Sequence, residues 1–237
     1  MINSKRLLGV GLVVGSVACG SSSSSSNPNS PSTTSTNHNP AITTLSVSPS
    51  FGVSSLNTFT FSGAATDADG DALTYTWTYG GATSTGTSVT ATLAGDGSIT
   101  VRLTVTDTKG GSATDTRAVT LGTMTGTWSV AFANCNGAST NPANPFTLVL
   151  TQTTAGVVTG PMTMPVAVCN ASAGTTGQTD PADPGSITAA AAVRLRIKVG
   201  AFIDFTLTGT MDSTGRKVTG TTSGSGLDGV AFTMTKQ

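Results

Sequence analysis

Apolar and polar residues alternate along most of the chain after residue 40, and this period of two constrains the fold more than any other feature. Successive side chains of a β-strand point to opposite faces of a sheet, so such alternation predicts strands that bury one face. No stretch of this region competes with it by showing the longer period of a helix. Thr and Val, which suit a pleated and half-buried surface, fill the alternating segments. The sequence therefore predicts an all-β protein.

The start of the chain has a different character. Lys5 and Arg6 precede an apolar run over residues 7–17, and small residues then lead to Cys19. A basic start, a short apolar stretch and a small-residue exit are typical of a secretory signal peptide. The apolar run has about half of the roughly 20 residues that a membrane-spanning helix needs. We therefore expect residues 1–18 to be a signal peptide and the protein to be exported.

Residues 16–19 read Ser-Val-Ala-Cys, which resembles the lipobox of bacterial lipoproteins. The resemblance implies cleavage before Cys19 and acylation of this residue, and several acyl chains would anchor the protein to a membrane almost irreversibly. Gly20 follows the cysteine, where the family uses Asp for retention in the inner membrane. The resemblance therefore implies the bacterial outer membrane or the cell surface. Ordinary secretion without a lipid is the alternative.

Residues 19–41 begin with the lipidated cysteine and continue as a Ser-, Asn- and Pro-rich segment. Such a segment cannot bury enough surface to offset the entropy lost on ordering, so we expect a flexible linker. His38, the single histidine of the chain, falls in this linker, and we expect its imidazole to be solvated.

Residues 42–122 contain about seven short alternating segments, which Gly-Gly and Asp-Gly turns separate. Strands at this spacing favour an antiparallel β-sandwich. Two alternating apolar series are the clearest: Leu73, Tyr75, Trp77 and Tyr79 in one, and Ile99, Val101, Leu103 and Val105 in the other.

Two motifs identify this block further. Residues 65–77 read Ala-Thr-Asp-Ala-Asp-Gly-Asp-Ala-Leu-Thr-Tyr-Thr-Trp, and residues 105–111 read Val-Thr-Asp-Thr-Lys-Gly-Gly. Together they resemble the PKD domain, an immunoglobulin-like module of bacterial surface proteins, and the resemblance implies a sandwich with Trp77 in its core. The family motif Trp-Asp-Phe-Gly-Asp-Gly reads Trp-Thr-Tyr-Gly-Gly at residues 77–81. A related immunoglobulin-like or cadherin-like module is therefore the alternative.

Asp67, Asp69 and Asp71 form the one dense carboxylate cluster of the sequence. Carboxylate oxygens are ligands that Ca²⁺ prefers, and neighbouring negative charges favour a counter-cation. Some relatives of the PKD domain hold calcium in this loop, and in those the resemblance implies Asp107 as a further ligand. Structural calcium is thus the one cofactor that the sequence suggests. A plain Asp-Gly turn without a metal is the alternative.

Residues 123–237 form a second block, with about seven or eight predicted strands. An antiparallel meander of this size can close into a small barrel or form a second sandwich. Its opening Gly-Thr-Trp, and the Thr-Gly-Thr repeats within residues 207–210 and 218–221, resemble barrels of the avidin and lipocalin type. That resemblance implies a ligand pocket at the barrel mouth. The alternative is a barrel that its own side chains fill.

Cys135 and Cys169 remain after Cys19 has been assigned to the lipid. An even number of cysteines in an exported protein predicts a disulfide, so we expect these two residues to be bonded to each other. Two free thiols are the alternative.

Arg194, Arg196 and Lys198 share one face of a predicted strand. We expect this row to be a solvated strand face, with Asp204 as a cross-strand partner. The alternative is a site for anionic polysaccharide or lipid headgroups.

The acidic residues of the chain number 11 and are all Asp, and the formal net charge is zero. Without Glu, and with its one His in the linker, the chain cannot build a Ser-His-Asp triad, a His-rich zinc site or the Glu pair of a glycosidase in the usual way. We therefore assign no catalytic residue and expect no enzyme. A zero net charge also argues against nucleic acid as a partner.

These features predict a membrane-anchored lipoprotein of the cell envelope that acts as a non-catalytic binding or spacer module. Its expected partners are the membrane, through the N-terminal lipid, and an extracellular polysaccharide or another envelope protein. Two alternatives stay open. One is a small-ligand carrier with a hollow C-terminal barrel, and the other is an accessory module of an exported hydrolase.

Overall fold

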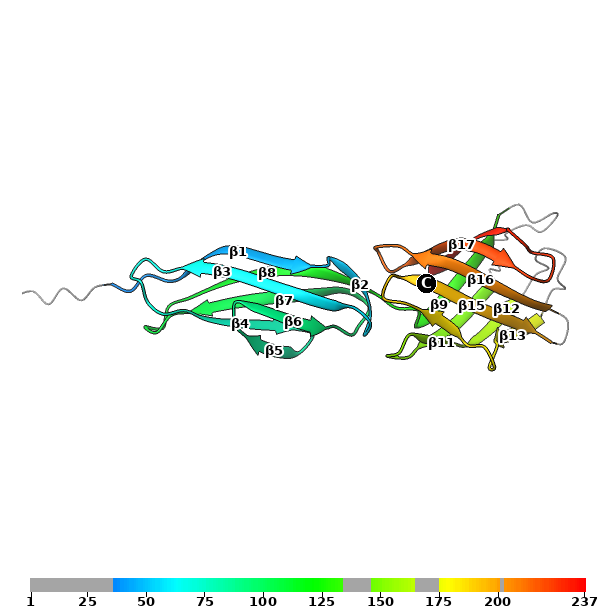
Figure 1. Ribbon diagram of the computed structural model, residues 1–237, viewed down its shortest axis with the longest axis horizontal. Coiled ribbons are helices and arrows are strands. Elements are labelled where there is room, and N and C mark those ends of the chain that lie inside the picture. Colours follow the sequence, from blue (N-terminus) through cyan, green and yellow to red (C-terminus); the bar gives the residue numbers. More distant parts are fainter. Residues whose placement is uncertain (1–35, 134–145, 165–174, 201–202) are drawn as a thin grey trace, which may run out of the picture. The chain divides into compact units, whose positions relative to one another are not determined.

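The computed structural model describes residues 36–133, 146–164, 175–200 and 203–237. All the regular secondary structure in these ranges is β-strand, so the predicted all-β class is confirmed (Figure 1). No helix among the described residues is long and apolar enough to cross a membrane. All the strands lie within one compact unit, Asn37–Gln237.

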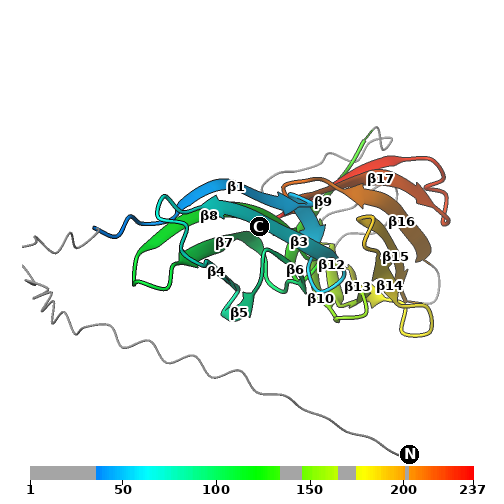
Figure 2. The same cartoon turned by 60° about the vertical axis from the view of Figure 1, so that its left-hand side comes forward.

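Strands β1–β8 form two sheets that pack face to face as a sandwich (Figures 1 and 2). The smaller sheet has the order β1 (Ala41–Ser48), β3 (Thr58–Thr66) and β6 (Ser88–Thr92). The larger sheet has the order β2 (Phe51–Val53), β8 (Ser112–Gly122), β7 (Gly97–Thr106), β4 (Thr74–Tyr79) and β5 (Ala82–Thr85). Their pairings are antiparallel except for that of β2 with β8, which is parallel.

The inward faces of these strands carry the apolar residues that alternate in the sequence. Phe61, Trp77 and Leu103 have no exposed surface, and the rings of Phe61 and Trp77 lie 5.8 Å apart. The indole N–H of Trp77 donates to the carbonyl of Gly86 at 2.8 Å, which satisfies the one polar group of this buried side chain. Trp77 therefore lies in the core, as the sequence predicts.

Strands β9–β18 form one sheet that closes on itself, and we call it the barrel. Strands β14 to β17 each pair in antiparallel order with the next strand along the chain, β18 returns to pair with β9, and β9 pairs with β10. Strands β11 and β12 both pair with β10, and β13 and β14 both pair with β15. The pairings of β11 with β14 and of β12 with β13 then close the barrel between β10 and β15. The strands are β9 (Gly126–Phe132), β10 (Phe146–Gln152), β11 (Val157–Thr159), β12 (Pro161–Met164), β13 (Thr175–Thr179), β14 (Gly185–Ile187), β15 (Ala192–Val199), β16 (Ile203–Met211), β17 (Lys217–Ser223) and β18 (Ala231–Lys236).

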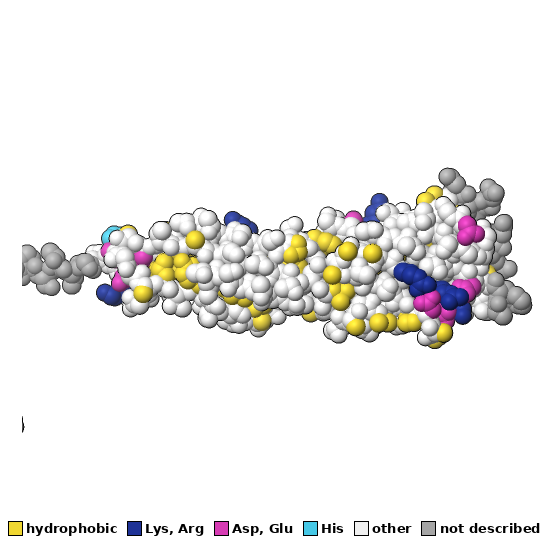
Figure 3. All heavy atoms as spheres, in the orientation of Figure 1, with side chains coloured by type: hydrophobic (Ala, Val, Ile, Leu, Met, Phe, Trp, Pro, Cys, Tyr) yellow, Lys and Arg dark blue, Asp and Glu magenta, His cyan; other side chains and the backbone are white. Residues whose placement is uncertain are grey.

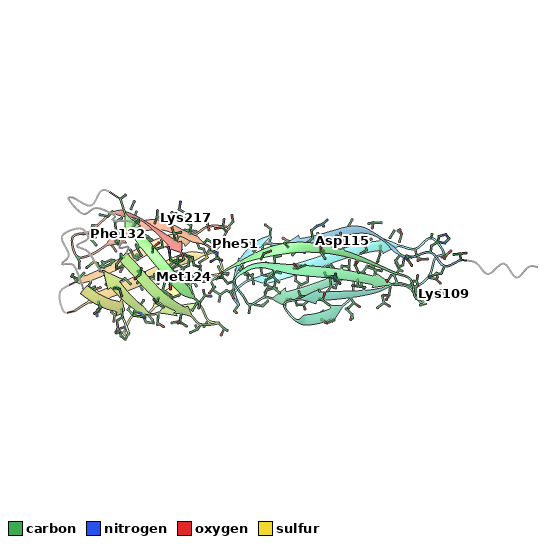
Figure 4. All side chains as sticks on the ribbon, turned by 180° about the vertical axis from the view of Figure 1, so that it is seen from behind. Phe51, Lys109, Asp115, Met124, Phe132 and Lys217 are labelled. Carbon is green, nitrogen blue, oxygen red and sulfur yellow. The ribbon has the colours of Figure 1, made fainter. Side chains whose placement is uncertain are left out.

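Buried apolar side chains from every side of the barrel form one cluster. Trp128, Leu148 and Leu195 in this cluster have no exposed surface. Phe132, labelled in Figure 4, lies with its ring 5.8 Å from that of Phe146 and 6.4 Å from that of Phe205. These contacts across the interior support the packed form of the barrel over the hollow one.

The Thr-Gly-Thr repeats mark a close approach between two strands. Gly209 on β16 and Gly220 on β17 face each other in the register. A Cβ atom on Gly220 would lie 2.5 Å from the Cα atom of Gly209 and 2.7 Å from the carbonyl carbon of Thr208. Glycine is needed at this pair because the backbones leave no room for a side chain, which is typical of tight bends in small barrels.

Candidate functional site

The three predicted calcium ligands lie together in the loop between β3 and β4. Asp67, Asp69 and Asp71 each offer a carboxylate oxygen, and these oxygens lie within 4.8 Å of one another. Lys109, labelled in Figure 4, approaches from the loop between β7 and β8, with its Nζ atom 3.9 Å from an oxygen of Asp71. The structure thus brings the predicted residues close enough together to share one cation.

Local hydrogen bonds explain why both loops fold as they do. The Oδ1 atom of Asp67 accepts from the backbone N–H groups of Asp69 at 2.9 Å and Asp71 at 3.2 Å. Asp107 repeats this arrangement, since its Oδ1 atom accepts from the N–H groups of Lys109 and Gly111, both at 2.8 Å. Asp side chains commonly fix turns in this way. Each loop therefore uses one carboxylate oxygen for its own structure and keeps the other for further contacts.

The segment that precedes β1 contacts both loops, which the sequence did not reveal. The side-chain amide of Asn37 donates to Asp107 at 3.0 Å. His38 donates its backbone N–H to Asp69 at 2.7 Å, and its Nδ1 atom lies 3.0 Å from the same carboxylate. The imidazole is 64% exposed, so the expectation of solvent contact holds in part, but His38 is also bound to the loop. The prediction that the imidazole of His38 is solvated was therefore incomplete, because it did not include the contact with Asp69.

These contacts change the acidity of two carboxyl groups. The backbone N–H of His38, followed by its side chain, lowers the pKa of Asp69 below its ordinary value. The amide of Asn37 makes the largest contribution to lowering the pKa of Asp107. Both carboxyl groups are therefore held in the charged form, which is the form that binds a metal ion.

Two buried oxygen atoms at this site, Asn37 Oδ1 and Asp67 Oδ2, have no hydrogen-bond partner among the residues that the structure describes. A Cβ atom placed on Gly111 would lie 2.8 Å from Asn39 Oδ1, so the glycine leaves space beside a further amide oxygen. Carboxylate and amide oxygens are a donor set that suits Ca²⁺. The chemistry of these donors therefore suits a calcium ion at the cluster of Asp67, Asp69 and Asp71. Asp69 would have to exchange its contact with His38 for the metal.

The basic row on β15 is the second concentration of charge, visible as a cluster of blue and magenta in Figure 3. Arg194, Arg196 and Lys198 alternate with buried residues and point outward, as predicted. Arg196 donates to both oxygens of Asp204, at 2.9 and 2.6 Å. The predicted role of Asp204 as a cross-strand partner is thus correct, with Arg196 as its diagonal neighbour.

The loop between β13 and β14 supplies two further carboxylates. Asp183 accepts two hydrogen bonds from Arg194, at 2.8 and 2.7 Å. Asp180 is 3% exposed and lies 2.9 Å from the Nζ atom of Lys198 and 3.4 Å from Arg196. We call these six side chains the ion-pair network: Asp180, Asp183, Arg194, Arg196, Lys198 and Asp204. Each cation has a carboxylate partner, which favours the predicted solvated face over a site for anionic ligands.

The network lowers the pKa of all its carboxyl groups. Hydrogen bonds from Arg194 lower the pKa of Asp183 to about 2. Lys198 is the main cause of a lowered pKa for Asp180, and Arg196 is the main cause for Asp204. The carboxylates also raise the pKa of Arg196, through Asp204 above all. The network therefore stays fully charged at neutral pH, as expected for ion pairs that hold a surface loop against a sheet.

The three cysteines lie outside the described residues. Acylation of Cys19 and a disulfide between Cys135 and Cys169 therefore stay predictions.

Comparison with known proteins relates the first half of the described chain to a family. The family model of the PKD domain matches residues 37–121. A crystal structure of the PKD1 domain of Epp from Vibrio anguillarum is similar at 26% identity, with a TM-score of 0.29 over 36% of this chain and 96% of that one.

A second similar structure comes from a study of promiscuous specificity in carbohydrate-binding modules of the β-sandwich superfamily. It shares 16% identity, with a TM-score of 0.35 over 85% of this chain and 93% of that one. The search of curated proteins found no match. The matched family model begins at residue 37, so it includes the segment whose Asn37 and His38 contact the loops. Residues 37–121 thus carry an immunoglobulin-like PKD domain, and a second, antiparallel β-domain follows it.

Proposed function

We propose that the protein is an exported lipoprotein of the bacterial cell envelope that acts as a non-catalytic binding or spacer module. The observation that carries the proposal is the PKD match over residues 37–121, which follows a segment with the features of a lipoprotein signal peptide and linker. The lipid on Cys19 would hold the protein at the outer membrane or cell surface, and the two β-domains would face outward. A polysaccharide or another envelope protein would be its partner.

Membrane anchoring is tested by comparing the wild-type protein with Cys19→Ser in the native bacterium. The wild-type protein should incorporate labelled palmitate and sediment with the outer membrane. The variant should lose the label and appear in the soluble fraction, because a thiol is needed for acylation. A wild-type protein that carries no label would refute the anchor.

Binding and catalysis are separated with the soluble chain that begins at residue 20. The chain is applied to an array of envelope polysaccharides, and the same glycans are assayed for new reducing ends. Retention without cleavage supports a binding module, and neither retention nor cleavage supports a spacer. Release of reducing ends would refute the non-catalytic proposal and favour an exported hydrolase. The carrier alternative has weaker support because the interior side chains of the barrel, including Trp128 and Leu195, form one packed cluster.

We further propose that calcium binds at the loops that carry Asp67, Asp69, Asp71 and Asp107. The unpartnered oxygens of Asn37 and Asp67 support this proposal, since a cation would supply their missing contacts. Calcium sites of extracellular modules have dissociation constants on the order of 10⁻⁴ to 10⁻³ M. At 10-fold to 100-fold excess over the dissociation constant, binding stabilises the folded state by about 1.4–2.7 kcal/mol. That gain raises the melting temperature by roughly 3–10 °C for a chain of this size.

The calcium test compares melting temperatures with calcium and with EDTA. Asp67→Asn should abolish the increase, because it removes a charged ligand that also orders the loop. Asp115→Asn is the matched control, since Asp115 lies on β8 and pairs with Arg117 instead (Figure 4). An unchanged wild-type melting temperature at about 10 mM calcium, which is 10-fold to 100-fold above these dissociation constants, would refute the site.

A further inference from the structure

The connection between the PKD domain and the barrel is short, and hydrogen bonds hold it throughout. Strand β8 ends at Gly122 and β9 begins at Gly126, so three residues join the two domains. The hydroxyl of Thr123 accepts from the N–H of Thr125 at 3.1 Å, and the hydroxyl of Thr125 accepts from the N–H of Gln152 at 2.9 Å. A segment with this many contacts lacks the properties of a flexible interdomain linker.

The side chain of Gln152, at the end of β10, binds both domains. Its Oε1 atom accepts from the hydroxyl of Thr123 at 3.1 Å and from the N–H of Met124 at 2.8 Å. Its Nε2 atom donates to the carbonyl of Ser54 at 3.1 Å, in the turn that follows β2 of the PKD domain. One barrel residue therefore makes three hydrogen bonds to the connection and to the PKD domain.

Apolar residues of the PKD domain complete the core of the barrel. Val53, at the end of β2, has no exposed surface and belongs to the buried cluster of the barrel rather than to that of the sandwich. Phe51 and Leu56 pack against the same cluster, which also contains Met124 (Figure 4). Burial of an aliphatic side chain contributes roughly 1.5–3 kcal/mol. The barrel would expose part of its own core if these residues were removed.

The turn that presents Val53 is held firmly by its own domain. Val53 donates its N–H to Asn57 at 2.6 Å, and Ser54 donates its N–H to Gly122 at 2.8 Å. Ser55 has a φ angle of 64°, a conformation that non-glycine residues adopt at some cost, and its N–H donates to Leu93 at 2.8 Å. The PKD domain thus fixes the position from which Val53 and Leu56 enter the barrel core.

Further contacts lie at the same junction. The Nζ atom of Lys236, whose side chain is 4% exposed, lies 2.9 Å from Asp96 of the PKD domain and donates to Thr123 at 3.0 Å. Gly122 of β8 and Gly215 of the β16–β17 turn approach so closely that a Cβ atom on Gly215 would lie 2.6 Å from the Cα atom of Gly122. Polar, apolar and backbone contacts therefore all cross this boundary.

We propose that the PKD domain and the barrel unfold as a single cooperative unit, because the turn after β2 closes the barrel core. The turn is then a structural part of both domains. Whatever force or ligand acts on one domain is transmitted to the other without a hinge. This inference concerns the joint alone and holds whether or not the protein carries a lipid or binds a polysaccharide.

The experiment uses the soluble chain from residue 20 onward and two matched variants, Leu103→Ala in the sandwich core and Leu195→Ala in the barrel core. Both leucines are fully buried, and neither belongs to the residues at the junction. Hydrogen exchange read by mass spectrometry at increasing urea concentrations gives a separate unfolding midpoint for the peptides of each domain. We expect each variant to lower the midpoint of both domains equally, by about 1 M urea.

Two variants of the junction complete the test. In a Gln152→Ala background, and more strongly in a Val53→Asp background, the two domains should separate, and Leu103→Ala should then lower the midpoint of the sandwich alone. The inference would be overturned if Leu103→Ala shifted the sandwich peptides of the otherwise unaltered chain and left the barrel peptides at their original midpoint. It would also be overturned if Val53→Asp left both midpoints unchanged.

Discussion

Replacing Gly220 with alanine tests the close approach of β16 and β17, because the structure predicts a loss of stability where such a substitution usually brings a gain. Glycine in a strand costs conformational entropy, so Gly→Ala commonly stabilises a protein by about 0.4–1 kcal/mol where the native backbone accepts a side chain. At Gly220 the new Cβ atom would lie 2.5 Å from the Cα atom of Gly209 and 2.7 Å from the carbonyl carbon of Thr208. Both neighbours are backbone atoms, so no rotation of a side chain can relieve the overlap.

The cost of this overlap follows from what must move. Overpacking costs about 1–3 kcal/mol, and separating β16 from β17 weakens ladder hydrogen bonds worth about 0.5–1.5 kcal/mol each. We therefore expect Gly220→Ala to destabilise the fold by about 3 kcal/mol and to lower the melting temperature by roughly 6–12 °C. The assay is thermal unfolding followed by circular dichroism, with Thr221→Ala as the control because Thr221 is the exposed neighbour on the same strand. A melting temperature that rises, or stays within a degree of the wild-type value, would show that the strands do not meet as described.

Three further predictions concern the ion-pair network and the cysteines. The pKa of Asp183 is about 2, below its ordinary 3.8, so its ion pair stabilises the fold fully above about pH 4 and loses this effect as the pH falls toward 2. The melting temperature of Asp183→Asn should therefore vary less between about pH 4 and pH 2 than that of the wild-type protein. Parallel pH profiles of the two proteins would contradict this. Arg196→Ala should lower the melting temperature more than Arg102→Ala does, because Arg102 is an exposed arginine on β7 outside the network. The difference between the two variants should shrink in 1 M NaCl because salt screens ion pairs. Equal losses in the two variants would count against the network. The protein should gain the mass of two hydrogen atoms on reduction if Cys135 and Cys169 are bonded, and an identical mass before and after reduction would exclude the disulfide.

Strand positions and their buried faces could be predicted from sequence because they depend on local alternation. The row from Val193 to Val199 is an example, since its apolar residues point into the barrel core and Arg194, Arg196 and Lys198 point outward, as expected. Trp77 was placed correctly for the same reason. The closed form of the second sheet was one of two predicted forms, because alternation fixes the face of each strand but leaves open whether the last strand pairs with the first.

Contacts between distant segments were the part that sequence did not reveal. In the sequence, Asp180 and Asp183 each precede a proline, a pattern typical of turns. Their role as partners of the basic row depends on how β13 and β14 pair with β15. The one indication in the sequence was that a loop with two carboxylates precedes the three cations of the basic row by about ten residues. Asn37 and His38 were assigned to the linker because nothing local distinguishes them from its other polar residues.

The junction was missed for a related reason. Val53 belongs to a short segment whose pattern indicates a strand but cannot indicate which of two cores receives it. A segment of three residues is too short for its pattern of apolar residues to show that one of them is buried in a neighbouring domain. Such assignments need the tertiary structure, because the partner residues lie about 100 positions away along the chain, as Gln152 does from Ser54.

The closure of the second sheet determines which strand edges of the barrel a neighbouring chain could reach. An open sheet presents a row of unpaired backbone groups that can template the attachment of another chain. Strand β9 pairs with β10 on one side and β18 on the other, and β18 pairs in turn with β17, so the first and last strands of the barrel offer no such row to a neighbour. The barrel therefore offers a neighbouring copy no strand edge at its first or last strand, whereas the two sheets of the sandwich are open and end at β1 and β6 and at β2 and β5.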